Sequence, residues 1–381
     1  MGRASSANIV IIGAGIAGAS VAYFLTQKGV RDILILEKEN FAGAQSTGRN
    51  AAILRSAMPD PLLRDLGRES AQFYREAPEG FSSQPLLRQV GLYLVAKSDH
   101  AQSLLSWALD DEGKSGTELV DPAELYARIP ILAPGLTAVL HQPDEGVLDI
   151  HTILQSFLSG ACRAGAELRL AREASSLKTA GNRIIGVQTP EGLLCADQVV
   201  MAGGGWAAGL AGEAGISIPL VPYRRHLLVT NPLPKVDARW PVVWCEGEEF
   251  YFRPESGGLL MCGCDTVAVS PEDGQKTDPA ELERIAIKAA HWLPSLGDAG
   301  VARAWAGMRT FAPDQRFVIG PDPHVRGLHW LAGLGGHGMT CAPAVGEIAA
   351  EWIAEGRCSH PAASALLPMR FLKQDRLRIG N

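Results

Sequence analysis

The residues with the clearest chemical meaning form a glycine-rich turn near the start of the chain. Gly13, Gly15 and Gly18 lie between an apolar run at 8–12, typical of a buried parallel strand, and an amphipathic stretch at 16–28. In a strand–turn–helix unit the first glycine makes the turn, the second lets the backbone approach a pyrophosphate, and the third lets the helix pack on the strand. Free N–H groups at the helix start stabilise the phosphate charge. The pattern predicts a dinucleotide site formed by Gly13, Gly15, Ile16, Ala17 and Gly18.

A second part of that site follows about 20 residues later. Residues 32–36 are a continuous apolar run that predicts the second strand of a βαβ unit, and Glu37 and Lys38 stand at its end. A carboxylate there accepts hydrogen bonds from ribose hydroxyls and repels a 2′-phosphate. These residues predict a dinucleotide, but they do not distinguish NAD from FAD.

The rest of the chain predicts two lobes, each assembled from separate segments. Helices are expected at 61–76, 100–112, 149–164, 278–292 and 342–355, strands at 167–170, 183–189, 198–202, 227–230, 249–253, 259–263 and 328–332, and a hairpin-like alternation at 91–96. We expect an α/β fold in which residues 1–80, 145–218 and 319–371 form a Rossmann-like dinucleotide-binding domain. Residues 81–144 and 219–318 would form a discontinuous α+β substrate domain with a mostly antiparallel sheet, and 372–381 a tail.

Composition narrows the class of partner. The 381 residues carry a formal net charge of −6, which argues against nucleic acid, because that partner requires a clustered basic surface. Seven scattered cysteines without metal-ligand spacing predict reduced thiols in the cytoplasm and no metal site. Cys262 and Cys264 are expected to be two small side chains on one strand face. Glycines interrupt the apolar run at 9–25, which therefore predicts no transmembrane segment.

Four further motifs occur later in the chain. They are Ser46 to Ile53 (STGRNAAI), Ala202 to Trp206 (AGGGW), Ala304 to Asp314 (AWAGMRTFAPD) and Gly335 to Met339 (GGHGM). In these motifs, and at 343–346 and 367–371, the chain resembles the D-amino-acid oxidase superfamily. The similarity is nearest to the branch that holds glycine oxidase, monomeric sarcosine oxidase and D-arginine dehydrogenase. It covers nearly the whole chain in the family's order and implies an FAD-dependent oxidoreductase.

The resemblance also implies which later residues hold FAD. They are Ser46, Thr47, Arg49, Asn50, Ala51, Ala202, Gly203, Trp206, Gly307, Gly335, Gly336, His337, Gly338 and Met339. Hydroxyl and guanidinium groups suit pyrophosphate and flavin oxygens, although a surface salt bridge is an alternative for Arg49. Glycine amides before a helix stabilise negative charge on the reduced ring. His337 matches a residue that lies over the flavin in sarcosine oxidase, and the alternative is a hydrogen-bonded core histidine.

The same resemblance implies an amine site. Arg309 stands in the family's carboxylate-binding position, and Tyr251 matches a strand tyrosine that contacts the same carboxylate. In this family a hydride passes from the α-carbon to flavin N5, and the imine product hydrolyses to a 2-oxo acid. The expected catalytic set is Arg309, Tyr251 and His337, with an interdomain ion pair and a core tyrosine as the alternatives for the first two. Arg224 and Arg225 either select a charged side chain or lie on a solvated face.

Four positions depart from the family's patterns. Gly307 stands where sarcosine oxidase carries its flavin-binding cysteine, and Gln45 stands near a flavin-binding histidine of dimethylglycine dehydrogenase-like relatives, so FAD should be non-covalent. Met261 lies close to the position of a lysine that assists sarcosine oxidase in reacting with oxygen. This favours a quinone or another electron carrier over oxygen as acceptor. Ile53 replaces the active-site histidine of D-arginine dehydrogenase, which puts D-arginine in doubt as a substrate.

Three functions stay open on the sequence. The first is oxidation of a D-amino acid, glycine or a sarcosine-like secondary amine, by an oxidase or, slightly favoured, a dehydrogenase. The second is oxidation of a 2-hydroxy acid or glycerol 3-phosphate, which would need a base for the hydroxyl proton. The third is a non-catalytic flavoprotein partner. Arg370, Lys373, Arg376 and Arg378 form either a solvated tail or a contact with the inner face of a membrane.

Overall fold

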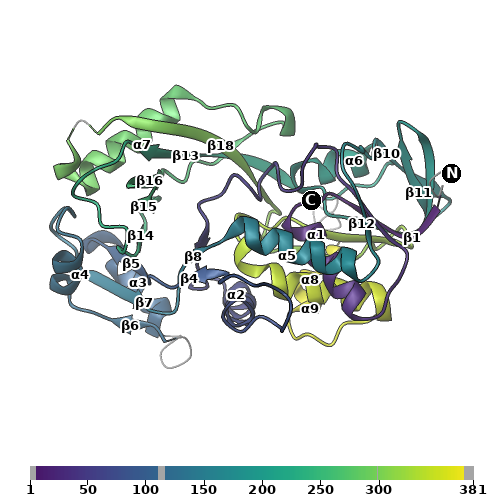
Figure 1. Ribbon diagram of the computed structural model, residues 1–381, viewed down its shortest axis with the longest axis horizontal. Helices are drawn as coiled ribbons and strands as arrows, with labels where there is room; N and C mark the ends of the chain where they lie inside the picture. The colour runs from purple at the N-terminus through teal and green to yellow at the C-terminus, as the bar shows by residue number, and fades with distance from the viewer. Residues whose placement is uncertain (1–5, 110–115, 298, 373–381) are drawn as a thin grey trace, which may run out of the picture.

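The described part of the chain, residues 6–109, 116–297 and 299–372 of a computed structural model, forms two lobes along the long axis of the molecule (Figure 1). One lobe is built on an eight-stranded sheet with parallel strands at its centre. The other is built on a nine-stranded sheet in which most neighbours are antiparallel. The α/β class expected from the sequence is therefore confirmed.

The first lobe has the layered arrangement of a dinucleotide-binding fold. Its parallel strands are β20 (Leu328–Ala332), β12 (Gly192–Met201), β1 (Ser6–Ile12), β2 (Ile33–Leu36) and β9 (Glu167–Arg169), and β10 (Ser176–Ala180), β11 (Arg183–Thr189) and β19 (Val318–Pro321) extend the sheet as antiparallel neighbours. Helices α1 (Ile16–Gln27), α5 (Ile150–Arg163) and α8 (Gly338–Glu355) share one core with Ile9 and Ile11. Val10 and Ile12 face a second core, so β1 is buried on both sides.

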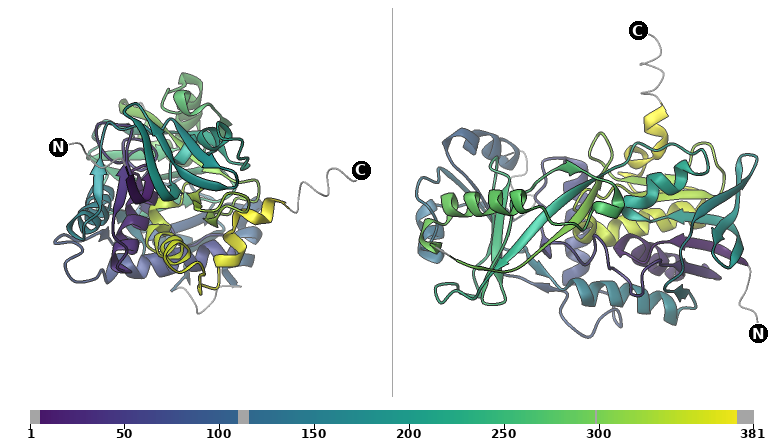
Figure 2. Two further views of the ribbon diagram at one scale, coloured as in Figure 1. Left: turned by 90° about the vertical axis from the view of Figure 1, so that its right-hand side faces the viewer. Right: turned by 90° about the horizontal axis from the view of Figure 1, so that it is seen from above.

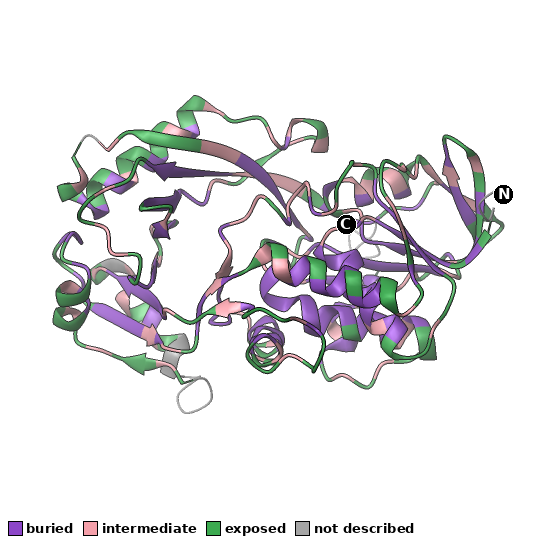
Figure 3. Ribbon diagram, in the orientation of Figure 1, coloured by how far each residue is buried: buried purple, intermediate pink, exposed green. Residues whose placement is uncertain are grey.

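The second lobe has a sheet with two different faces. Its strands are β5 (Leu92–Ala96), β6 (Glu118–Leu119), β7 (Ala138–Gln142), β13 (Val221–Thr230), β14 (Val242–Cys245), β15 (Phe250–Glu255), β16 (Gly258–Cys262), β17 (Val267–Ala268) and β18 (Val301–Phe311). Helices α7 (Pro279–Trp292) and α4 (Pro122–Arg128) pack on the outer face through Ile285, Trp292 and Leu125. Exposed residues on α7 face away from that core (Figure 3). The other face carries Tyr251 and Cys262 and packs against Ala51 from the first lobe.

Short elements join the lobes and complete the fold. A third sheet of β3 (Ile53–Leu54), β8 (Gly146–Leu148) and β4 (Leu87–Arg88) lies where the chain passes between them. The remaining helices are α2 (Pro61–Arg75), α3 (Ser98–Leu109), α6 (Ala207–Gly212) and α9 (Ala363–Leu366), with 3-10 turns at Gly204–Trp206, Pro271–Asp273, Pro294–Leu296 and Pro368–Phe371. The long pair β13 and β18 runs from the second lobe to the first (Figure 2). No helix within the described ranges is both long and apolar enough to cross a membrane.

Some expected elements differ from the observed ones. The stretch at 91–96 is wholly buried and pairs with β14 and with the distant β7, so the hairpin-like interpretation was wrong. β18 was not expected, because its alternation is broken by Gly307 and by charged residues, yet it pairs along nearly all of β13. Helix α8 begins at Gly338, four residues earlier than expected. Residues 110–112 of one expected helix, and Lys373, Arg376 and Arg378, lie outside the described residues.

Candidate active site

A cavity of about 580 Å³ opens at the carboxyl ends of β1, β2 and β12 and reaches β18 of the second lobe. Most residues that the sequence assigns to a dinucleotide line it. These are Gly13, Gly15, Ile16, Ala17, Glu37, Lys38, Ser46, Thr47, Asn50, Ala202, Gly203, Trp206, Gly335, Gly336, Gly338 and Met339, together with Arg309. Six other residues predicted for the site do not line this cavity: Gly18, Arg49, Ala51, Gly307, Tyr251 and His337.

The glycine turn presents backbone to the cavity. Gly13 has a φ of 103°, which favours glycine, and a Cβ there would lie 2.6 Å from the carbonyl oxygen of Ala202. A Cβ on Gly18 would lie 1.9 Å from the carbonyl oxygen of Gly13, so this residue serves helix packing. The Thr47 hydroxyl accepts a hydrogen bond from the N–H of Ile16 at 3.0 Å. The turn and the first turn of α1 are thereby fixed to the loop that follows β2.

Glu37 closes the other side of the glycine turn. Its buried carboxylate accepts hydrogen bonds from the N–H groups of Ala14 at 2.9 Å and Glu39 at 3.0 Å. A carboxylate has further lone pairs, and this one lines the cavity, so it can also accept hydrogen bonds from hydroxyl groups there. The position at the end of β2 is the one a ribose requires.

The outer mouth of the cavity joins the two lobes. The ammonium of Lys38 lies 3.4 Å from the ring centre of Trp206, and the indole N–H of Trp206 donates to Glu272 of the second lobe at 3.1 Å. Sequence reasoning missed the neighbouring segment 172–175, which also lines the cavity. The topology could have predicted this segment. Strand β9 runs parallel to β2, so the residues that follow β9 must lie next to Glu37 at the end of β2.

A crossed pair of arginines ties the loop at 43–52 to β18. Arg49 donates to the carbonyl oxygens of Ala44 at 3.2 Å and Ala306 at 3.4 Å, and Arg309 donates to that of Arg49 at 3.2 Å. Arg49 therefore donates hydrogen bonds to backbone carbonyl groups and does not form with any described residue the surface salt bridge that was the alternative. A Cβ on Gly307 would lie 2.8 Å from both Cβ and O of Arg49, so the close approach of the lobes requires glycine.

Arg309 is a buried cation at the inner end of the cavity. Two of its N–H groups donate to the carbonyl oxygens of Met308 at 2.8 Å and Arg49 at 3.2 Å. Within the described ranges no acidic side chain forms an ion pair with it, and the guanidinium has further N–H groups for a ligand. Burial lowers the pKa of Arg309, whereas Tyr251 opposes that shift. A Cβ on Gly336 would lie 3.1 Å from its Cδ, so the glycine segment before α8 packs on this side chain.

His337 is the N-cap residue of α8 and is half-buried. Burial lowers its pKa to about 3, and the positive charges of Arg55, Arg225 and Arg309 add to this effect. The imidazole is therefore neutral at physiological pH. Its chain neighbours Gly336 and Gly338 line the cavity.

Tyr251 lies on the face of the second lobe's sheet that packs against Ala51 of the first lobe. It is buried and stacks on Trp244, with ring centres 4.4 Å apart and planes at 20°. Cys262 is its register partner on β16, so the two side chains share a face. Met261, one residue before Cys262, packs in the core on the outer face of the sheet. The position matched in the sequence to the oxygen-assisting lysine of sarcosine oxidase therefore points away from the site.

Cys262 and Cys264 are free and buried beside Tyr251. Burial opposes ionisation of Cys262, but its hydrogen bond with Cys264 and the charge of Arg225 lower the pKa of this thiol to about 6. The pKa of Cys264 is raised by the same hydrogen bond. Across the described ranges no group of three or more histidine, cysteine or acidic side chains is arranged to hold a metal ion.

Comparison with known proteins identifies the family. Residues 8–352 match the DAO family, described as FAD dependent oxidoreductase. The chain belongs to this family. Human mitochondrial dimethylglycine dehydrogenase is 29% identical over 371 residues, covering 92% of this chain and 43% of the relative, so the chain spans less than half the length of that enzyme. Glycine oxidase of Pseudomonas putida is 28% identical, covering 89% of this chain and 92% of the relative.

A solved structure shows the same fold. L-proline dehydrogenase from P. horikoshii superposes with a TM-score of 0.86 at 25% identity, covering 97% of this chain and 98% of that one. The residues of the cavity fit the cofactor of the DAO family. The glycine turn and the start of α1 suit the pyrophosphate, Glu37 suits the ribose, and backbone without side chains at Gly335 and Gly336 leaves room for a ring beside Arg309. FAD is therefore the cofactor of this chain.

Proposed function

We propose that the chain oxidises an amine whose nitrogen-bearing carbon also carries a carboxylate, such as an α-amino acid or an N-substituted glycine, to an imine that hydrolyses to a 2-oxo acid. The observation that carries the proposal is Arg309. It is a buried arginine without an acidic partner among the described residues, and it lines the cavity beside the glycine segment of α8. A buried guanidinium of this kind is the usual anchor for a planar carboxylate.

Orientation is the main contribution of the chain's own side chains. Arg309 binds the carboxylate, and Tyr251, held by its stack on Trp244, supplies a hydroxyl from the facing strand. Two fixed contacts on one carboxylate restrict rotation of the adjacent carbon. Bound FAD supplies the hydride acceptor of the reaction. The non-covalent state of FAD is part of the proposal, since Gly307 and Gln45 have no group that bonds to a flavin.

The amine must lose a proton before oxidation, and the site favours that loss electrostatically. His337 has a pKa of about 3 and is a weak base. The charges of Arg225 and Arg309 disfavour a second cation, so a bound ammonium releases its proton more readily than in water. Positive charge around the substrate thereby favours the neutral amine, and the released proton passes to solvent water.

Anaerobic bleaching of the flavin near 450 nm (about that wavelength for oxidised flavins) tests the proposal. The panel holds D- and L-alanine, D- and L-proline, glycine, sarcosine and D- and L-lactate. We expect bleaching by at least one amino acid, and a loss of about tenfold to hundredfold in its efficiency in Arg309→Lys, which keeps the charge but loses the planar fork. Flavin content of each variant is measured first, so that loss of cofactor is not mistaken for loss of substrate binding.

The other outcomes are decisive as well. Bleaching by lactate alone would replace the proposal with hydroxy-acid oxidation. A flavin that no substrate bleaches would support a non-catalytic partner. The electron acceptor is tested in the same experiment by admitting air and then a soluble quinone. We expect the quinone to reoxidise the flavin faster than oxygen does, because no lysine lies on the site face of β16.

A further inference from the structure

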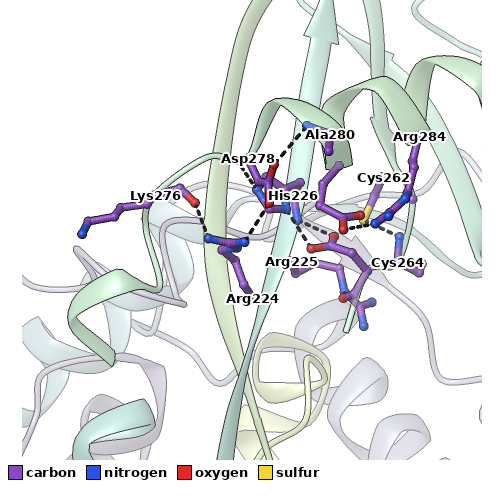
Figure 4. A network of polar contacts seen from close by, with 12 residues as sticks. Arg224, Arg225, His226, Cys262, Cys264, Lys276, Asp278, Ala280 and Arg284 are labelled. Carbon is purple, nitrogen blue, oxygen red and sulfur yellow. Dashed lines mark hydrogen bonds and ion pairs between the residues drawn. The ribbon is translucent and has the colours of Figure 1, made fainter. Parts of the chain in front are cut away.

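Two neighbouring arginines of β13 have opposite roles. Arg224 donates to Asp278 at 3.3 Å and to the carbonyl oxygen of Lys276 at 3.3 Å, so it holds the segment that leads into α7. Arg225 comes next in the strand and points to the opposite face of the sheet. Figure 4 shows the two side chains diverging from β13. Arg225 shares its face with Gly307, which packs on Arg49 of the first lobe.

Arg225 lies among the residues of the proposed amine site. It is the register partner of Gly307 on β18, two residues from Arg309, and both arginines point to the same face. Diagonal neighbours on adjacent strands stand about 7 to 8 Å apart. The charge of Arg225 acts on Tyr251, Arg309 and His337, which the sequence assigns to catalysis.

The terminal N–H groups of Arg225 have no partner among the described residues. Its Nε donates to the carbonyl oxygen of Asp265 at 3.0 Å. The carboxylate of Asp265 instead accepts two hydrogen bonds from His226, each 2.7 Å long. The side chain of Arg225 is half-buried, so its terminal nitrogens are not fully enclosed by the protein. The guanidinium can therefore still bind an anion.

The other charges near the site are compensated. Arg55 forms a 2.5 Å ion pair with Glu246 and lies 4.1 Å from the ring centre of Trp244. The thiols of Cys262 and Cys264 also lie beside Arg225, and the N–H of Cys264 donates to the sulfur of Cys262 at 3.4 Å, so a Cys262 thiolate offsets part of the charge of Arg225. The terminal N–H groups of Arg225 still have no acceptor among the described residues, so Arg225 and Arg309 together offer donors to two separate carboxylates.

We propose that Arg225 forms a second anion subsite, so that the preferred substrate is a short amino or imino dicarboxylate. Arg309 would bind the carboxylate next to the oxidised carbon, and Arg225 a second carboxylate a few bonds away. This inference rests on the proposed oxidation of a carboxylate-bearing amine. The two arginines start from diagonal positions on adjacent strands, about 7 to 8 Å apart, and both side chains are flexible. Their guanidinium groups can therefore converge on two carboxylates of one ligand that are separated by roughly one to three atoms.

Binding of substrate-like acids that cannot be oxidised tests the subsite without relying on turnover. Malonate and acetate are titrated into the FAD-loaded protein, and binding is followed by calorimetry and by the shift of the flavin spectrum. We expect malonate to bind about tenfold or more tightly than acetate, since a charge-assisted hydrogen bond is worth about that factor or more. Arg225→Gln should reduce this preference to within about twofold, whereas Arg224→Gln should leave it unchanged. Arg225→Lys should keep part of it.

Two results would overturn the subsite. One is equal binding of malonate and acetate by the unaltered protein. The other is an equal loss of both ligands in Arg225→Gln, which would mean that this arginine acts through the fold or through Cys262. Flavin bleaching by iminodiacetate and by sarcosine separates this inference from the proposed function. Equal bleaching by both contradicts the subsite alone, whereas a malonate preference without bleaching by any amine contradicts the proposed oxidation and leaves the subsite standing.

Discussion

At the scale of single residues, the site depends on which charges are paired. Arg49 and Arg55 are used by carbonyl groups and by Glu246, whereas Arg309 and Arg225 keep N–H groups for a ligand. Family motifs predicted roles for Arg309 and Tyr251 in the site. It could not separate Arg224 from Arg225, because their difference arises from the strand register and from the partner Asp278.

The proton lost from the substrate gives a prediction on pH. The efficiency of flavin bleaching by sarcosine should rise with pH and level off at a pKa below that of the free amine, because Arg225 and Arg309 disfavour the ammonium. Stopped-flow measurements between pH 6 and pH 10, a range chosen to bracket roughly the amine's ionisation, give the profile. In His337→Asn this profile should keep its inflection, because His337 is neutral throughout. An inflection that disappears with the imidazole would identify His337 as the base.

A buried histidine outside the site gives a prediction on stability. Burial lowers the pKa of His329 to about 4, and its Nε2 lies 2.9 Å from the side-chain oxygen of Gln198. Between this value and the ordinary pKa the unfolded chain binds a proton that the folded chain does not, so stability is lost as pH falls from 7 to 5. Replacing His329 with Gln should reduce that loss by about 1 to 2 kcal/mol. Urea unfolding at both pH values measures it, and an unchanged pH dependence would contradict the assignment.

At the scale of elements, the sequence revealed most of the parallel sheet and less of the second lobe. Strand β1 and helix α1 are apolar runs on either side of a glycine motif, so their type and limits could be predicted. Helix α1 is buried on nearly all sides, so the expectation of an amphipathic helix was wrong. Strand β18 could not, because it is stabilised by pairing with β13 and its own residues alternate weakly. The contact between Arg49 and Gly307 joins segments more than 250 positions apart, and no local pattern encodes it.

The packing of α1 on the glycine turn can be tested with a matched pair of helix substitutions. Gly18→Ala would place its Cβ 1.9 Å from the carbonyl oxygen of Gly13, whereas Gly212→Ala in α6, away from the cavity lining, meets no atom within 4 Å. We expect Gly18→Ala to destabilise the protein by about 2 kcal/mol or more and to lose FAD. Gly212→Ala should be neutral or stabilise by up to about 1 kcal/mol. Thermal unfolding and the flavin-to-protein absorbance ratio measure both effects, and equal behaviour would argue against the close approach.

The turn between β7 and β8 contains Glu145, a buried carboxyl group whose pKa is raised. Glu145 is 3% exposed, and burial raises its pKa to about 7 despite a hydrogen bond from the N–H of Ser56 at 2.6 Å. Because the folded state holds this proton more tightly than the unfolded chain does, stability is lost as pH rises from the ordinary carboxyl pKa of 4.5 to about 7. Glu145→Gln should match the unaltered protein at about pH 4 and exceed its stability by about 1 to 3 kcal/mol at about pH 8. A difference that is the same at both pH values would show that the carboxyl group is not titrating.

At the scale of the whole molecule, the cavity joins both lobes, since it is lined by β1 and α1 on one side and by Arg309 of β18 on the other, and FAD bound there would contact both. Acid precipitation should release all of the flavin into the supernatant, because neither Gly307 nor Gln45 can form a bond to it. Adding FAD to the stripped protein should raise the melting temperature of both lobes together. At a thousandfold excess over the dissociation constant the gain is about 4 kcal/mol. Flavin that remains with the precipitate would contradict a non-covalent site.

The close contact at Gly307 also limits how this chain could evolve. A cysteine at that position, the residue that carries the flavin in sarcosine oxidase, would collide with the backbone and Cβ of Arg49 at 2.8 Å. The single exchange would therefore weaken the fold before any thioether could form. A lineage starting from this sequence would first have to move the Arg49 loop. A covalent flavin would therefore require two changes in order, first a shift of the Arg49 loop and then a cysteine at position 307.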